Sequence, residues 1–224
     1  QAMYGAVDLL VVGQFSSAAA VSAVSTGSQI LQSVTTVITG IAMGITVLVG
    51  QKIGEKHPHE AGMIIGSGIA MFAVIAVILT ILMTCGASSL SALMQAPEEA
   101  FSETTAYIRI CSAGAVFIIA YNVLGSIFRG IGDSKMPLIT VAIACVINIA
   151  GDLLFVAGFH WGAAGAAAAT VLAQAVSVLL SFLIIRKRAL PFTMKRTDLR
   201  FNLPVIGKIL KLGCPIALQD FLVS

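Results

Sequence analysis

The stretch Ala61–Leu93, AGMIIGSGIAMFAVIAVILTILMTCGASSLSAL, contains no charged side chain and decides the fold class of this chain. A helix needs about 20 mostly apolar residues to cross a hydrocarbon core roughly 30 Å thick, and this stretch is longer than that. Similar apolar stretches, each predicted to be a membrane-spanning helix, are Ala20–Gly50, Thr104–Phe128, Met136–Phe159 and Gly162–Ile185. The sequence therefore predicts an all-α membrane protein built as a helical bundle.

Composition excludes the other broad classes. The chain has 224 residues, of which 58% are hydrophobic and 10% are charged, and its mean hydropathy is +1.00. Soluble domains carry about 25% charged residues, so a soluble globule and a disordered chain are both ruled out. The cysteines stand singly in apolar runs, which excludes a disulfide framework and a metal knuckle. We interpret them as small core residues.

The two ends of the chain contain shorter apolar runs. Ala2–Phe15 is too short to cross a bilayer, and Leu212–Ser224 begins another apolar run. We expect a fragment with six spans, the first of them truncated, followed by the opening of a seventh helix. The expected domains are a transmembrane bundle at 1–185, a basic cytoplasmic linker with an amphipathic segment at 186–211, and the start of helix seven at 212–224.

Basic residues are distributed unevenly among the predicted loops. All of them except Arg109 follow the second, fourth or sixth span. By the positive-inside rule, these loops and the N-terminal end are expected in the cytoplasm of a multi-pass cell-membrane protein. The basic linker is expected to contact anionic membrane lipids, with its second half as a short helix on the membrane surface. It lacks interleaved aromatic residues, which weighs against nucleic acid.

Glycines recur at four-residue spacing, as in Gly40 and Gly44 or Gly62 and Gly66. Small residues at this spacing let helix backbones approach closely in a membrane. The pattern predicts tight helix packing and says nothing about a substrate.

Polar side chains inside the apolar helices mark a candidate site, because ionisable groups at membrane depth are costly and usually functional. Asp8 and Asp152 are carboxylates of this kind, and Asn148 lies one turn before Asp152 on the same helix face. Pairs with the same spacing, or single polar groups in the fourth span, add Tyr4, Tyr107, Asn122, Thr170 and Gln174.

Oxygen and amide groups of this kind suit a hard monovalent cation or a proton. Transition metals prefer sulfur or imidazole ligands, and we expect no cysteine or histidine near these groups. Neighbouring carboxylates away from water hold protons more tightly, so protons and cations would compete for one site. The alternative is that Asn148 and Asp152 form a buried hydrogen-bonded pair that only fixes helix packing. No hydrolase, metalloprotease or phosphate-loop motif is found, and we expect no enzyme activity and no cofactor.

Four segments carry a resemblance to a known family. They are VDLLVVGQF at Val7–Phe15, VGQ at Val49–Gln51, FRGIGDSKMP at Phe128–Pro137 and LGCPIA at Leu212–Ala217. Together they span nearly the whole chain, and the Arg-Gly-x-Gly-Asp loop with its following proline is fairly specific. The chain resembles the N-terminal lobe of a MATE (multidrug and toxic compound extrusion) transporter.

The resemblance implies twelve helices in two lobes that export drugs or cationic organic compounds in exchange for Na⁺ or H⁺. It also implies a C-terminal lobe of the same full-length chain as a partner. The family's N-lobe cation site falls here on Asp8, Asn148, Asp152 and Thr170. Residues expected around this site, toward the substrate, are Tyr4, Tyr107, Asn122 and Gln174. Some members carry a glutamate in the seventh helix, whereas this chain has Gln219 and Asp220 in that region.

Two other functions remain open at this point. A lipid-linked sugar flippase of the same broad fold would line its cavity with basic residues, yet only Arg109 lies near membrane depth outside the basic loops. A non-transporting membrane scaffold or channel subunit would use the buried aspartates for structure alone.

Overall fold

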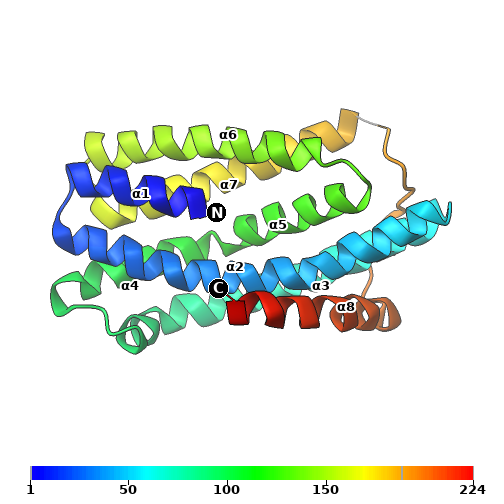
Figure 1. Cartoon of the computed structure of the whole chain (residues 1–224), viewed down its shortest axis with the longest axis horizontal. Coiled ribbons are helices and arrows are strands. Elements are labelled where there is room, and N and C mark those ends of the chain that lie inside the picture. Colours follow the sequence, from blue (N-terminus) through cyan, green and yellow to red (C-terminus); the bar gives the residue numbers. More distant parts are fainter. Residues whose placement is uncertain (1, 188, 224) are drawn as a thin grey trace. The chain divides into compact units, whose positions relative to one another are not determined.

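The computed structural model describes residues 2–187 and 189–223, with the backbone alone for residues 2–4 and 196. The described residues contain helices and no strand, as predicted. The elements in chain order (Figure 1) are α1 (Ala2–Phe15), α2 (Ala18–Gly54), α3 (Pro58–Leu93), α4 (Glu98–Ala113), α5 (Ala115–Gly130), α6 (Lys135–Asp152), the π-helix η1 (Leu153–Gly158), α7 (Gly162–Lys187), the 3₁₀-helix η2 (Arg196–Asp198) and α8 (Leu203–Val223).

The predicted membrane spans are confirmed by length and composition. Among the described residues, α2, α3, α7 and the combined helix Lys135–Gly158 are each long and apolar enough to cross a membrane. The pair α4 and α5 also passes this test when taken as one bent span. α1 is apolar but short, as the sequence predicts. Large apolar side chains such as Ile81 and Leu82 are exposed on α3, which suits contact with lipid.

The span predicted at Thr104–Phe128 is not a single straight helix. It bends by 54° between α4 and α5, at Gly114, where Val171 of α7 occupies the space that a side chain would need. Backbone hydrogen bonds continue through the bend, since Gly114 N–H donates to the Ile110 carbonyl at 3.1 Å. Glycine is a common site of helix kinks, and here close packing against α7 explains why no larger residue occupies the bend.

The chain divides into two compact units. Unit 1 comprises Gln1–Gln32, Val77–Ile118 and Val141–Ser177, and unit 2 comprises Ser33–Ala76, Ile119–Thr140 and Val178–Ser224. In unit 1, buried small residues of α7 pack with apolar residues of α1 and α2 and with part of α4; this core includes Val12, Ala20, Val24, Tyr107, Cys111, Ala163 and Ala166.

Unit 2 contains the glycine contacts that the sequence predicts. Gly40 and Gly44 of α2 lie against the α8 backbone at Ala217 and Ile209, and Gly213 of α8 lies against Ile41. α8 is one continuous helix, and it crosses the boundary predicted between residues 211 and 212.

Gly62 and Gly66 differ from that pattern, because they contact the chain that follows α7 rather than another helix. A side chain at these positions would meet the carbonyls of Thr193 and Asp198. Thr193 N–H also donates to the Pro58 carbonyl at 3.3 Å. The segment that contains Thr193 and Asp198 is therefore docked on α3.

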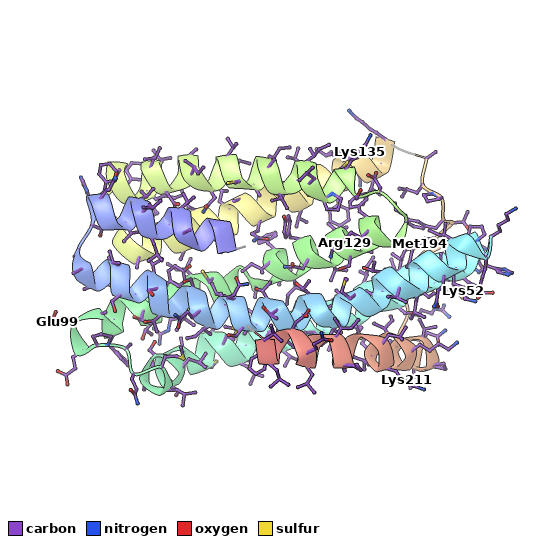
Figure 2. All side chains as sticks on the ribbon, in the orientation of Figure 1. Lys52, Glu99, Arg129, Lys135, Met194 and Lys211 are labelled. Atoms are coloured by element: carbon purple, nitrogen blue, oxygen red, sulfur yellow. The ribbon has the colours of Figure 1, made fainter. Side chains whose placement is uncertain are left out.

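Lysines and arginines are distributed unevenly between the units. Arg109 is the one described lysine or arginine that belongs to unit 1, which also contains Glu98, Glu99 and Glu103. Figure 2 labels Lys52, Lys135 and Lys211 among the basic residues of unit 2. This separation agrees with the predicted distribution of basic loops, and the cytoplasmic orientation stays a prediction.

We expect Gly44→Leu to lower the free energy of unfolding by about 1–3 kcal/mol, because the new side chain forces the α8 backbone away from α2. Gly86→Ala is the matched control, since nothing lies within 4 Å of a side chain added there. Reversible unfolding in detergent measures both variants. Equal stability of the two would contradict the close contact between α2 and α8.

Candidate cation site

Three helices of unit 1 supply the four residues predicted to bind an ion. Asp8 lies in the middle of α1, Asn148 and Asp152 lie in the last turns of α6, and Thr170 lies in α7. Figure 1 shows α1 alongside α6 and α7. Three of these side chains are buried, with exposed fractions of 1% for Asp8 and 0% for both Asn148 and Asp152, and Thr170 is half-buried.

The Thr170 hydroxyl links these helices. Thr170 Oγ1 donates a hydrogen bond to Asp8 Oδ2 at 3.1 Å, and it accepts one from Asn148 Nδ2 at 3.3 Å. The carboxyl groups of Asp8 and Asp152 are direct electrostatic neighbours. The structure therefore brings all four predicted residues together.

Several oxygens in this region have no hydrogen-bond partner among the residues that the structure describes. They are Asp8 Oδ1, Asn148 Oδ1, both Asp152 carboxylate oxygens and Gln174 Oε1. Buried polar atoms are nearly always satisfied in native proteins, and an unsatisfied one costs about 1–3 kcal/mol. Because all of these atoms are acceptors unless protonated, the chemistry that suits them is a cation or a proton.

Tyr107 lies beside this cluster. Its ring packs on Gly27 of α2, where Tyr107 Cε1 would be 2.9 Å from an added side-chain carbon. Its hydroxyl is within electrostatic range of Asp8 and Asp152. The ring is buried in the core of unit 1.

Cys111 is a residue that sequence reasoning missed, and the expectation that no cysteine lies near the site was wrong. The thiol is fully buried, next to Tyr107 and within electrostatic range of Asp8. The available signal was the four-residue spacing between Tyr107 and Cys111, which places both on one face of α4. No group of three His, Cys, Asp or Glu side chains able to hold a metal ion occurs in the described part of the chain.

The remaining predicted residues fall in different places. Gln174 is buried one helical turn after Thr170 in α7. Asn122 belongs to unit 2, where its Oδ1 accepts a hydrogen bond from Thr39 Oγ1 at 3.1 Å. The side chain of Tyr4 lies outside the described residues.

A π-helical turn follows the site directly, and the sequence analysis did not predict it. η1 begins at Leu153, the residue after Asp152, and α1 packs against it. π-helical turns are rare and occur frequently at functional sites. Hydrophobic periodicity gives no signal for one turn with wider spacing inside an apolar span, so the sequence alone did not reveal it.

We expect Thr170→Val to lower the free energy of unfolding by about 1–3 kcal/mol, because it leaves Asp8 Oδ2 and Asn148 Nδ2 buried without their shared partner. Thr170→Ser keeps the hydroxyl and is expected to stay close to wild type. Thermal or denaturant unfolding in detergent compares the two. If valine and serine gave the same stability, the hydroxyl bridge would be wrong.

Known proteins resemble this chain in sequence. A family model described as MatE matches residues 1–154. The chain is 28% identical over 237 residues to the probable multidrug resistance protein YpnP of Bacillus subtilis, with 100% of this chain and 50% of that protein covered. It is 25% identical over 226 residues to the multidrug export protein MepA of Staphylococcus saprophyticus, covering 99% of this chain and 49% of that protein.

Solved structures give the same result. An inward-facing multidrug resistance MATE family transporter of the MOP superfamily superposes with a TM-score of 0.90 at 25% identity, over 98% of this chain and 50% of that one. A MATE crystal structure in complex with MaD3S gives a TM-score of 0.89 at 25% identity and the same coverage. The chain spans about half the length of these proteins. With the family model matched over most of its length, the chain belongs to the MatE family and is a multi-pass membrane protein.

Proposed function

We propose that the full-length protein exports drugs or cationic organic compounds across the cell membrane in exchange for Na⁺ or H⁺. Asp8, Asn148, Asp152 and Thr170 would bind the coupling ion. The single observation that supports this most directly is the pair of buried, neighbouring carboxyl groups on α1 and α6, beside which the Thr170 hydroxyl of α7 donates to Asp8 and accepts from Asn148. The names of the similar proteins, which include multidrug resistance and multidrug export proteins, support the substrate class.

The proposed mechanism follows from charge. When no ion is bound, two ionised carboxylates side by side repel each other, and a bound proton or Na⁺ removes this repulsion. Ion binding would therefore favour the arrangement in which α1 packs on α6 and α7. In an alternating-access cycle, this repacking accompanies outward release of the substrate, and inward release of the ion allows reloading. A ligand shifts such an equilibrium only by its different affinities for the two states, so the aspartates must differ in ion affinity between them.

The neutral ligands bear on the choice of ion. An amide oxygen at Asn148 and a hydroxyl oxygen at Thr170 are ligands that hard cations accept. A proton needs only one carboxylate oxygen. Loss of the amide oxygen would therefore weaken Na⁺ binding more than proton binding.

We also propose that an N-terminal bundle at 1–185 is followed by the basic segment 186–211, whose last part from Leu203 onward belongs to the continuous helix α8. The basic loops of unit 2 would then face the cytoplasm, where Lys208 and Lys211 would lie near anionic lipid. The segment 212–224 would lead into a second lobe.

Asp152→Asn is expected to abolish ion-coupled efflux of ethidium from cells that express the full-length protein, because a neutral amide cannot take part in charge neutralisation. Assays with and without Na⁺ then identify the coupling ion in the wild type. Glu98→Gln, at an exposed carboxylate of α4, is the matched control and is expected to retain efflux. Unchanged efflux in Asp152→Asn would place coupling outside this site.

If Na⁺ is the coupling ion, it is expected to raise the unfolding temperature of the purified full-length protein relative to choline, since a ligand that binds only the folded state stabilises it. Asp8→Asn would remove this effect, and Asn148→Ala would shift it to higher Na⁺ concentrations. A Na⁺ effect of equal size in Asp8→Asn would show that the ion binds elsewhere.

A further inference from the structure

Three aromatic side chains gather at the end of η1. The rings of Phe155 and Trp161 are stacked almost in parallel, with centroids 5.3 Å apart and an interplanar angle of 6°. Phe159 lies 5.6 Å from Trp161 and 6.2 Å from Phe155, with both pairs tilted. Such pairs contribute about 0.5–1.5 kcal/mol beyond their buried area.

A tight turn returns Trp161 over the π-helix. His160 has a φ of 56° and Gly162 has a φ of 55°, so the backbone reverses through two left-handed residues. Trp161 N–H donates to the Phe155 carbonyl at 3.0 Å, and Phe159 N–H donates to the Leu154 carbonyl at 3.0 Å. Both the ring and the backbone N–H of Trp161 therefore contact the same residue, Phe155.

The turn is itself fixed against neighbouring segments of unit 1. An added side chain at Gly162 would lie 3.3 Å from both Glu103 Oε2 and Ser16 Oγ. A side-chain carbon added at Gly165, at the start of α7, would lie 3.1 Å from Phe155 and 3.1 Å from Trp161. A residue larger than glycine at either position would therefore crowd Glu103 and Ser16 or Phe155 and Trp161.

The opposite end of η1 is the ion site. Asp152 is the residue before the π-helix, and Val156 within it is completely buried in the core that contains Val12 and Tyr107. A π turn contains more residues than the 3.6 of an α turn. If the segment relaxed to an α-helix while the turn at Gly162 stayed in place, the residues before it would rotate, and Asp152 would turn away from Asp8.

We propose that Trp161 is a positioning residue: by stacking on Phe155 it holds the π-helical turn, and through that turn it fixes the Asp152 carboxyl beside Asp8 and sets the affinity for the coupling ion. This inference rests on the proposed function, because it concerns the ion that the site binds. Residues that orient ligands from outside a binding site typically change metal affinity by about 10–100-fold when they are replaced.

Trp161 also fits a second role that the experiment separates from the first. Its exposed fraction is 54% and it lies in the turn between two membrane spans, which is where tryptophan anchors helices at the membrane surface. Anchoring uses the amphipathic indole, whereas stacking uses a flat ring. Trp161→Phe keeps the ring on Phe155 and removes the indole N–H, so it distinguishes the two roles.

The test measures the ion concentration for half-maximal stabilisation of the purified full-length protein, with Na⁺ titrated at fixed pH and protons titrated by pH. Trp161→Ala is expected to weaken the ion response about tenfold while the protein stays folded, and Trp161→Phe is expected to restore it. Phe182→Ala removes an aromatic ring of similar exposure (52%) from α7 and is the matched control, expected to match wild type. Trp161→Leu, which keeps apolar bulk without a flat ring, replaces the alanine variant if that variant does not fold.

Hydrogen exchange of the Leu153–Gly158 amides is a second readout that does not depend on transport. Trp161→Ala is expected to speed this exchange. An unchanged ion response with unchanged exchange would overturn the proposal, and so would a phenylalanine variant as impaired as alanine. If Asp152→Asn kept the full ion response, the proposed function itself would be wrong, and faster exchange in Trp161→Ala would then leave the residue a structural role only.

Discussion

Two carboxyl groups buried side by side in an apolar bundle impose the constraint on which the rest of unit 1 depends. Removing one charge from water costs several kcal/mol even after relaxation, and placing two like charges together adds to that cost. The surrounding residues limit it: Thr170 donates to Asp8, and Asn148 in turn donates to Thr170. The glycines and alanines of Gly162–Ala169 keep α7 thin enough for α1 and α6 to approach it. Small residues are how membrane helices pack closely in general, and here the same residues bring the polar groups into contact.

The helical spans and the grouping of the polar residues could be predicted from the sequence for physical reasons. A span is a local property, since about 20 apolar residues meet the thickness of the membrane whatever they pack against. Asn148 and Asp152 share a face because of helical spacing alone. Their meeting with Asp8 and Thr170, far away in the chain, was available only through resemblance to a family. The fold itself is shared at 25% identity, which indicates that patterns of size and polarity carry it more than particular side chains.

The features that sequence reasoning missed depend on contacts between distant segments. The bend at Gly114 is explained by the packing of Val171 of α7. A glycine inside an apolar run does not indicate which residue will pack against it. Cys111 lies near Asp8 because α4 packs against α1 in one core. The π-helix has an apolar composition like that of the α-helix before it, and its aromatic stack closes through a backbone turn at His160. Asn122 accepts a hydrogen bond from Thr39, a partner that its position in a predicted span did not indicate.

The docking of Thr193 and Asp198 on the glycines of α3, together with the close contact between α2 and α8, changes how the connection after α7 should be understood. A basic, irregular segment between two helical regions usually suggests a flexible tether whose ends move independently. Here its carbonyls lie against bare backbone at Gly62 and Gly66, and α8 belongs to the same compact unit as α2. Movement of the segment that contains Thr193 and Asp198 away from α3 would have to break these contacts first. The connection is therefore packed into unit 2 as part of its core structure and is not a free tether.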